Sequence, residues 1–162
     1  MKWGIVVVLI LVTIITFWPV FLMGQIPLPG DILIGNYHPW KDVVWENKNA
    51  GYPVKNKELS DALTQYFPFK KEIIEQLKQG KIPWTNKYIF SGTPLLADGH
   101  SGALYPLNII FWITNNFAID WSIYIIVQPI LAGLFGYLFL RSLKLTKPAV
   151  YLGSLIFAFN SY

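Results

Sequence analysis

The sequence contains no cysteine. This absence excludes a disulfide framework and a thiolate metal site, two devices that often stabilise small extracellular folds. Histidine is scarce as well, with two in 162 residues. Any order in the polar part of the chain must therefore come from packing, from hydrogen bonds or from a surrounding membrane.

Charge is missing from two long stretches of the chain. No Asp, Glu, Lys or Arg occurs from Trp3 to Gly30 or from Trp121 to Leu140. Each stretch reaches the ~20 residues that cross a hydrocarbon core of ~30 Å. Together with a hydrophobic content of 54% and an aromatic content of 17%, these runs predict an α-helical integral membrane protein.

Acidic residues are missing from both ends of the chain. All nine lie in its middle part, at Asp31, Asp42, Glu46, Glu58, Asp61, Glu72, Glu75, Asp98 and Asp120. Nine lysines lie there too, so the net charge of +4 comes from Lys2, Arg141, Lys144 and Lys147. Basic residues at the ends of apolar helices follow the positive-inside rule, which predicts that the N-terminus and the "RSLKLTK" loop are cytoplasmic. The same distribution weighs against a nucleic-acid partner.

These features divide the chain into five segments. We expect a first transmembrane helix at 1–23, an extracytoplasmic loop at 24–120, a second transmembrane helix at 121–141, a cytoplasmic loop at 142–147 and the start of a third transmembrane helix at 148–162. The first helix is expected to be an uncleaved anchor, because its apolar run exceeds the ~7–15 residues of a signal peptide and no small-x-small site follows. The third covers only about 22 Å, which predicts a truncated helix and the N-terminal part of a longer, multi-pass protein of the cytoplasmic (plasma) membrane.

Three parts of the external loop differ in pattern. Residues 27–56 are rich in Pro, Gly, Asn and Trp and have no sustained period, which predicts extended and looped structure at the membrane surface. Residues 68–79 repeat apolar side chains every three or four positions between Pro68 and Gly80, which predicts an amphipathic helix with Lys and Glu on its outer face. Residues 105–118 are apolar but too short to span, which predicts an interfacial or re-entrant helix.

Small local signals refine this division. Ser60 is suited to be the N-cap of a short helical turn before the amphipathic helix. Pro19 is expected to kink the outer end of the first transmembrane helix. In the second transmembrane run, Ala132 and Gly136 form a small-xxx-small pair that lets another helix approach closely.

The segment from Gly80 to Asn108 is crowded with Gly, Pro, Asn and aromatic residues. It is too irregular for a helix and too apolar for a flexible tether. Its aromatic side chains could cover the apolar faces of a sugar while Asn and His bond hydroxyl groups, or they could pack on lipid headgroups. The residues alone leave both interpretations open.

Two constellations in the loop are weak signals for catalysis or metal binding. The sequence "GHSGA", Gly99 to Ala103, nearly matches a G-x-S-x-G nucleophile elbow, but it lacks the last glycine and the strand–turn–helix context, so a turn is favoured. Asp98 and His100, with Asp31, His38 or Asp61, could hold a divalent metal ion. The spacing matches no metal motif, and Asp98 could equally start an Asx turn.

Asp31 and Asp61 are candidates for a general base. Each follows a turn signal and precedes an apolar and aromatic run, in "PGDILIGNYHPW" and "SDALTQYFPF". Aromatic surroundings near a membrane can raise the proton affinity of a carboxylate, as a base requires. Chance placement is the alternative, since a loop with this many acids will set some beside Pro and Tyr.

The segment "SDALTQYFPFKKEIIEQLKQGKIPWTNKYIFSGTPLLADGHSGALYPLNIIF" resembles the first external loop of YfhO-like bacterial membrane proteins, and "LAGLFGYLFLRSLKLTKPAVYLGSLIFAFNSY" resembles the helix pair that follows it there. The resemblance covers residues 29–162. The residues that match the family pattern are Asp61, Gln65, Tyr66, Asn86, Tyr88, Gly92, Pro94, Tyr105 and Pro106. The sequence departs from the pattern at Thr85, Lys87 and His100, where the family has Trp, Pro and Gln.

The family is similar to GT-C glycosyltransferases, which take a sugar from a polyprenyl-phosphate carrier and pass it to a glycan, lipid or protein acceptor outside the cytoplasmic membrane. The resemblance implies that Asp61, or else Asp31, acts as the base. It implies that the substrate is bound by Gln65, Tyr66, Asn86, Tyr88, Gly92, His100 and Tyr105. The carrier phosphate would meet Lys70, Lys71 or Lys87; no cofactor is implied with certainty, and a divalent metal is possible.

Two alternatives remain beside the enzyme. One is a non-enzymatic membrane protein, either an assembly subunit or a transporter fragment, whose loop recruits a partner. Transporters often carry ionisable residues inside their spans, and the two uncharged runs carry none. The other alternative is an inactive, truncated gene product, in which the loop folds without the helices that would complete an active site.

Overall fold

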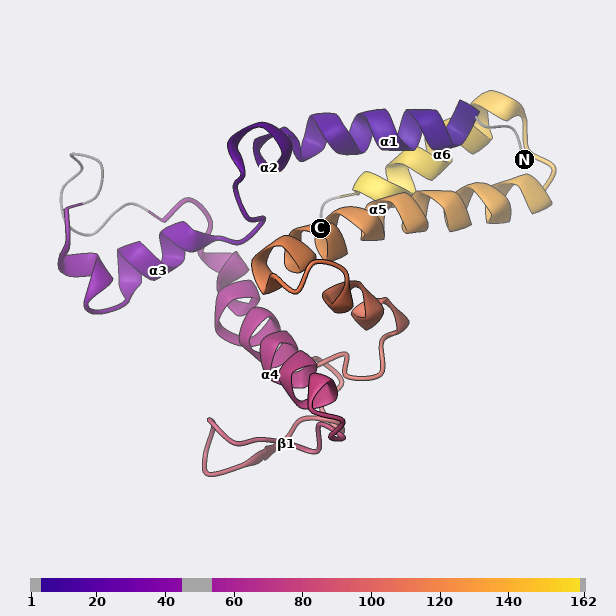
Figure 1. Cartoon of the computed structure of the whole chain (residues 1–162). Coiled ribbons are helices and arrows are strands. Elements are labelled where there is room, and N and C mark those ends of the chain that lie inside the picture. The colour runs from indigo at the N-terminus through magenta and orange to yellow at the C-terminus, as the bar shows by residue number, and fades with distance from the viewer. Residues whose placement is uncertain (1–3, 45–53, 161–162) are drawn as a thin grey trace. The chain divides into compact units, whose positions relative to one another are not determined.

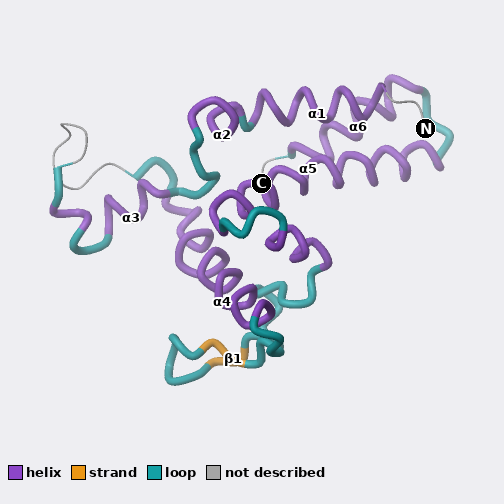
Figure 2. Tube along the Cα trace, in the orientation of Figure 1, coloured by secondary structure: helices purple, strands orange, loops and turns teal. Residues whose placement is uncertain are grey.

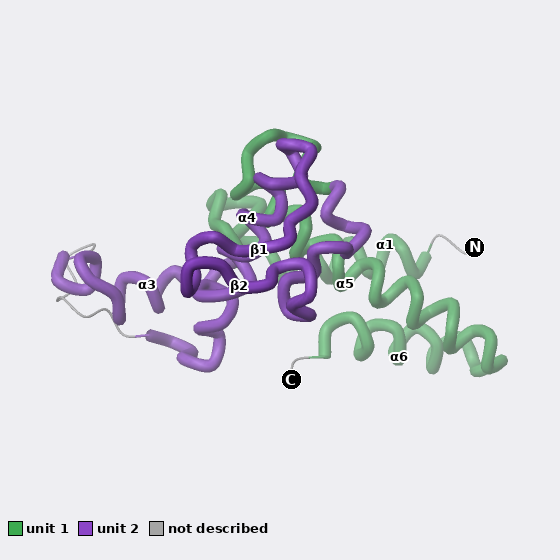
Figure 3. Tube along the Cα trace, turned by 90° about the horizontal axis from the view of Figure 1, so that it is seen from below, with its two compact units in different colours: residues 1–27, 110–162 green, residues 28–109 purple. Residues whose placement is uncertain are grey.

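In a computed structural model of the chain, the residues described are 4–44 and 54–160. The expectations that concern Lys2, residues 45–53 and the last two residues lie outside these ranges. The described chain is mostly helical (Figures 1 and 2). It divides into two compact units, unit 1 with residues 1–27 and 110–162, and unit 2 with residues 28–109 (Figure 3).

Helix α5, Phe117–Ser142, is the longest element of unit 1. Its 26 residues extend about 39 Å at ~1.5 Å per residue. Within the described ranges it is the one helix that is long and apolar enough to cross a membrane, and only 11% of its most apolar window is buried. Low burial separates it from the core helix of a globular domain, which would be mostly covered. It contains the predicted transmembrane segment 121–141 and begins four residues earlier.

The start of α5 is held by polar side chains. The Asn116 side chain caps the helix by accepting hydrogen bonds from the backbone N–H groups of Ala118 and Ile119. Asp120 is fully buried in the first turn, and its Oδ1 accepts from the backbone N–H (3.1 Å) and the hydroxyl (2.9 Å) of Thr114. A carboxylate at this end also interacts favourably with the helix dipole.

The interfacial helix predicted at 105–118 differs from the structure. A 3-10 helix, η4, covers Pro106–Trp112 and stops there. Asn115 then adopts a left-handed conformation with φ of 57°, which no helix continues through. The Asn pair thus separates the short helix from α5.

The predicted first transmembrane helix, 1–23, is two helices in the structure. Helix α1 covers Gly4–Thr16 and α2 covers Trp18–Met23. The break falls at Phe17, immediately before the turn that contains Pro19. The expected proline effect is therefore stronger than a kink, because proline has no N–H to donate to the preceding turn and its ring collides with that turn.

Helix α6, Lys147–Phe159, follows a tight turn after α5. In unit 1, α5 packs along α6 and against α1. The buried centre of this packing consists of Ile5, Leu9, Tyr137 and Val150. The turn between α5 and α6 lies within the predicted loop 142–147, because α5 ends at Ser142 and α6 begins at Lys147. The start of α6 is one residue before the predicted start of the third helix.

Glycines set the close approach of these helices. A Cβ atom at Gly133 would lie 2.4 Å from Leu9 Cδ2 and 3.1 Å from the Cβ of Ala158. At Gly136 it would lie 3.2 Å from the Phe157 ring. Gly136 of the predicted pair therefore lies at a helix contact, and Gly133, which the prediction did not include, lies at another.

Unit 2 begins with a helix where extended structure was predicted. Helix α3 covers Gly30–Asn36, with Asp31 in its first turn, and η1 covers Trp40–Asp42. The helix forms because Ile32 can be buried on one side of it, at 1% exposure, while the carboxylate of Asp31 favours its N-terminus. The prediction for residues 27–56 is therefore wrong over α3.

A continuous helical segment follows in unit 2. The side chain of Asn56 caps the 3-10 helix η2, Lys57–Leu59, so Ser60 is not the cap that was predicted and has helical backbone angles. A π-helical turn, η3, then covers Ala62–Tyr66 and runs into α4, Phe67–Lys78. Helix α4 corresponds to the amphipathic helix predicted at 68–79.

Helix α4 ends as its sequence predicts, and a short hairpin follows. Gly80 has a left-handed φ of 70°, and its N–H donates to the carbonyl of Leu77. Strands β1, Thr85–Asn86, and β2, Thr93–Pro94, pair antiparallel with Thr85 opposite Pro94 and Asn86 opposite Thr93. Bends and turns continue to η4.

A branched side chain at Gly133 should separate the helices of unit 1. Gly133→Val should lower the free energy of unfolding by about 1–3 kcal/mol, the usual cost of overpacking. Leu138→Val is the control, because Leu138 lies on the same helix and is 44% exposed. The measurement is SDS-induced unfolding in detergent micelles, followed by the near-ultraviolet circular dichroism of the tyrosines. Equal effects of the two substitutions would contradict the assignment of Gly133 to the helix contact.

Candidate functional site

The Gly80–Asn108 segment is bound to α4 by a buried lysine. The side chain of Lys70 is 5% exposed. Its Nζ donates hydrogen bonds to the carbonyl oxygen of Gly102 at 3.1 Å and to Oδ1 of Asn108 at 2.8 Å. A buried ammonium group is costly unless it is bonded in this way. The loop therefore closes around the end of this side chain.

Asn108 completes the connection. Its amide is 5% exposed, and Nδ2 donates to the carbonyl oxygens of Gly102 at 3.0 Å and Ala103 at 2.9 Å. Gly102 has a left-handed φ of 57°, and a Cβ there would lie 3.2 Å from Lys70 Nζ. We refer to Lys70, Gly102, Ala103 and Asn108 as the Lys70 network.

Burial lowers the pKa of Lys70 from its ordinary value of 10.5 to about 8. The cause is desolvation, which penalises the charged form. A neutral amine still has two N–H donors, so both hydrogen bonds can persist after the proton is lost.

A second polar connection joins α4 to the hairpin. The side chain Nε2 of Gln76 donates to Glu72 Oε1 at 2.7 Å and to the carbonyl oxygen of Thr85 at 3.0 Å. Glu72 is 4% exposed. The same helix therefore holds the loop near Asn108 and the first strand of the hairpin.

These contacts correct the expected outer face of the helix. Lys71 and Glu75 are exposed and 4.0 Å apart, as their spacing predicts. Lys70 and Glu72, in contrast, lie inside. Lys70 stands three and four residues before the buried Ile73 and Ile74, so helical geometry puts it on their face. Carbonyl and amide groups there form the hydrogen bonds that water would otherwise form with these side chains.

The "GHSGA" stretch forms a turn. The Asp98 carboxylate accepts the backbone N–H of His100 at 2.9 Å, which is an Asx turn. The Ser101 hydroxyl is 2% exposed and donates to the carbonyl oxygen of Asp98 at 2.8 Å. A serine so buried and bonded is poorly placed to act as a nucleophile.

Metal ligands do not gather in the described part of the chain. Asp98 Oδ1 lies 3.3 Å from Nδ1 of His100, and Asp42 Oδ2 lies 2.6 Å from Nδ1 of His38. Across residues 4–44 and 54–160 no group of three or more His, Cys, Asp or Glu side chains could hold a metal ion.

The π turn η3 brings predicted site residues together. Asp61 directly precedes the turn, and Gln65 and Tyr66 lie in it. Because a π turn closes i to i+5, residues four and five positions after Asp61 come to lie above it. The Tyr66 ring centre is 6.4 Å from that of His100. All four side chains are exposed, so a ligand can reach them.

Other predicted site residues lie elsewhere in unit 2. Asp31 accepts the backbone N–H of Lys55 at 2.8 Å, on α3, which packs against the π turn. Asn86 is 3% exposed and accepts the backbone N–H of Tyr88 at 3.0 Å, which gives it a structural position rather than a contact surface. Tyr105 is 41% exposed and follows Gly102 in the loop.

The hairpin presents the remaining predicted residues. Tyr88 is 73% exposed, and Lys87 Nζ lies 5.2 Å from the centre of its ring. Gly92 has a φ of 127° at the turn before β2, a conformation that favours glycine. Of the three lysines expected to meet a phosphate, Lys71 and Lys87 are exposed, whereas Lys70 is bound to the loop.

Sequence reasoning did not identify Asn108, Glu72 or Gly102 as residues that shape the site. Asn108 ends the "YPLN" stretch of the family pattern. Its place directly after the apolar Pro106 and Leu107 was the signal that could have indicated a buried side chain. The position of Lys70 on the apolar face of its helix was a second signal. No feature of the sequence marked Gly102 above its neighbour Gly99.

Comparisons of the chain with protein-family models, with curated proteins and with solved structures gave no match.

A methyl group at Gly102 should disrupt the Lys70 network. Gly102→Ala should lower the free energy of unfolding of the loop by about 1–3 kcal/mol, because the residue is left-handed and the added carbon approaches Lys70 Nζ. Gly99→Ala is the matched control, since a Cβ there meets no atom within 4 Å. Hydrogen exchange of the loop amides is the measurement. Equal protection in the two variants would contradict the role of Gly102.

The lowered pKa of Lys70 predicts a rise in stability at alkaline pH. Between about pH 8 and 10.5 the unfolded chain binds more protons at this residue than the folded chain, so its contribution to stability increases with pH. The free energy of unfolding of wild type minus that of Lys70→Met should therefore rise with pH across this window and stay constant below it. Lys71→Met is the matched control, because it removes an exposed lysine of the same helix; an equal rise for this variant would contradict the assignment to Lys70.

Proposed function

We propose that this chain is the N-terminal part of a GT-C-type membrane glycosyltransferase of the YfhO-like kind. It would transfer a sugar from a polyprenyl-phosphate carrier to a glycan, lipid or protein acceptor outside the cytoplasmic membrane. The resemblance over residues 29–162 supports this proposal. The length and low burial of α5 support a place in the membrane. We propose a cytoplasmic N-terminus and residues 24–120 outside from the position of the basic residues at the helix ends.

The observation that carries the proposal is the grouping of Asp61, Gln65 and Tyr66 at the π turn, with His100 beside Tyr66. π turns are frequent at functional sites. The aromatic rings offer flat faces to a sugar, while the amide and imidazole can bond its hydroxyl groups. The carboxylate of Asp61 is exposed to an incoming acceptor.

The reaction assigned to these residues is a substitution at the anomeric carbon. The acceptor oxygen forms a bond to that carbon, the bond from the carbon to the phosphate oxygen breaks, and the Asp61 carboxylate takes the acceptor proton. The leaving group is the polyprenyl phosphate. Of the three lysines considered for its charge, Lys71 and Lys87 are exposed, whereas Lys70 is bound within the loop.

The Lys70 network serves this site by position. It fixes the loop that carries His100 to the helix that continues from the π turn. Alignment of groups before reaction is a large part of enzymatic rate enhancement. The network would therefore make the loop a rigid wall of the site.

A second candidate function is a non-enzymatic role in partner or headgroup binding. The side chains of Trp84, Tyr88 and Phe90 in and beside the hairpin are 62%, 73% and 92% exposed. Exposed aromatic clusters are typical of surfaces that meet a partner or a membrane interface. This role would require no base at Asp61.

Asp61→Asn should abolish transfer while leaving membrane insertion intact. Loss of a general base costs about 10²–10⁴-fold in rate. The assay follows release of undecaprenyl phosphate from undecaprenyl-phosphate glucose, galactose or N-acetylglucosamine by the native full-length polypeptide, with cell-envelope membranes as acceptor. Asp42→Asn is the control, because Asp42 is exposed and bonded to His38 away from the π turn.

Full activity of Asp61→Asn would remove Asp61 from the mechanism and turn attention to Asp31. Absence of transfer with every donor, in a protein that inserts normally, would favour the binding role of the hairpin.

A further inference from the structure

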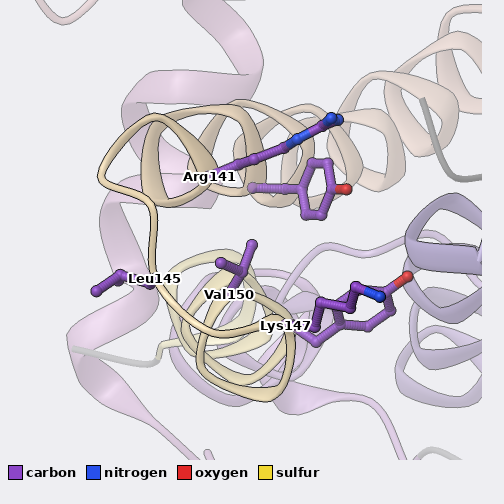
Figure 4. A pocket seen from close by; sticks show the side chains of 6 residues that line it. Arg141, Leu145, Lys147 and Val150 are labelled. Atoms are coloured by element: carbon purple, nitrogen blue, oxygen red, sulfur yellow. The ribbon is translucent and has the colours of Figure 1, made fainter.

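A cavity lies in unit 1 at the turn between α5 and α6 (Figure 4). It has a volume of about 220 Å³. Its lining comes from the end of α5, the turn and the first residues of α6: Tyr137, Arg141, Leu145, Lys147, Val150 and Tyr151. No residue of the proposed glycosyltransferase site is among them.

The cavity combines an apolar floor with a cationic rim. Val150 and Tyr137 are 4% and 5% exposed and belong to the buried centre of unit 1. The Tyr137 and Tyr151 rings meet edge to face, with centres 6.0 Å apart. Arg141 and Lys147 are exposed and extend from the two helices that border the cavity (Figure 4).

Nothing in the described chain neutralises these two cations. No acidic residue follows Asp120 in the sequence. The ion pairs of the described residues join His38 with Asp42, Lys71 with Glu75 and His100 with Asp98. The cationic rim therefore faces a space that an external anion can enter.

We propose that this cavity binds the phosphate of an anionic membrane phospholipid. The planar guanidinium of Arg141 suits two phosphate oxygens, and the ammonium of Lys147 adds a point charge. Lys147 is the first residue of α6, so its ammonium lies where that helix begins beside the cavity. The apolar floor accommodates the carbon atoms next to the phosphate.

The place of the cavity along the chain favours a lipid as the source of the phosphate. Phe135, Leu138 and Phe139 are 62%, 44% and 63% exposed, and Arg141 follows two residues after Phe139. The change from apolar to cationic surface thus falls at the cavity, where the headgroups would lie if α5 crosses a bilayer. Since a water occupies about 30 Å³, the space holds about seven waters, or one phosphate diester with part of its substituent.

This inference goes beyond glycosyl transfer and shares with the proposed function only the requirement that α5 lies in a membrane. The two can therefore fail separately. A protein without lipid selectivity could still transfer sugar at the Asp61 site. A protein without transfer activity could still bind a lipid in the cavity.

The test is native mass spectrometry of the full chain released from detergent micelles. Phosphatidylglycerol and phosphatidylcholine are titrated separately, and the dissociation constant of the first bound lipid is measured for each. Wild type should bind phosphatidylglycerol at least ten-fold more tightly than phosphatidylcholine. Each cation lost should weaken phosphatidylglycerol binding on the order of five-fold, so Arg141→Gln with Lys147→Gln should weaken it about 25-fold.

Lys144→Gln is the matched control. Lys144 lies in the same turn and carries the same charge, but it does not line the cavity. It should keep binding within about two-fold of wild type, whereas five-fold is expected for a phosphate contact. Each single variant, Arg141→Gln and Lys147→Gln, is measured as well, so that a folding defect of the double variant, detected by circular dichroism, does not decide the result.

Three outcomes would overturn the proposal. Equal losses for Lys144→Gln and for the cavity variants would mean diffuse surface charge and no site. Equal affinities of wild type for the two lipids would exclude selection for an anion. Displacement of phosphatidylglycerol by millimolar inorganic phosphate would identify free phosphate as the ligand instead of a lipid.

Discussion

The ammonium group of Lys70, withdrawn from water, is the constraint on which the order of the Gly80–Asn108 segment depends. An isolated buried charge is strongly unfavourable, so the folded state of unit 2 requires oxygen atoms around it. Gly102 and Asn108 provide those oxygens, and Asn108 in turn bonds Gly102 and Ala103. A stretch rich in glycine and proline is thereby held at one end, while Gln76 holds the first strand of the hairpin. His100 lies between these two attachments and comes to rest beside Tyr66.

Much of the helical framework could be predicted from the sequence, because charge and period mark it strongly. The uncharged run after Asp120 corresponds to α5, and the repeat of apolar residues before Gly80 corresponds to α4. The sequence could not predict α3, since its glycine-bounded run is too short for a period to be visible, and its formation depends on burial of Ile32. A π turn has no composition of its own, so η3 could not be predicted either.

The site was predictable only in part, for a related reason. Asp61 was identified from its local sequence and from a family motif, and Gln65 and Tyr66 from the motif alone. Such patterns specify residue types but not which side chains face one another. The burial of Lys70 was hidden because lysine normally marks an outer face, and only tertiary contacts reverse that expectation. Similarly, the close contact of Gly133 with Leu9 depends on the rotation of α5, which a pattern of small residues does not specify.

The Lys70 network also constrains how such a sequence can change over time. Replacing Lys70 alone leaves the buried Oδ1 of Asn108 without its donor, and replacing Asn108 alone leaves a buried ammonium short of an acceptor, so each single step is costly. Replacing both by apolar residues removes these two penalties, at the cost of the hydrogen bond from Asn108 to the carbonyl oxygen of Ala103. It also removes the ammonium group that a Cβ atom at position 102 would approach. The three positions are therefore energetically coupled. In related sequences they should be retained together or exchanged together, and a lineage that has lost the lysine should tolerate side chains at position 102 that this chain excludes.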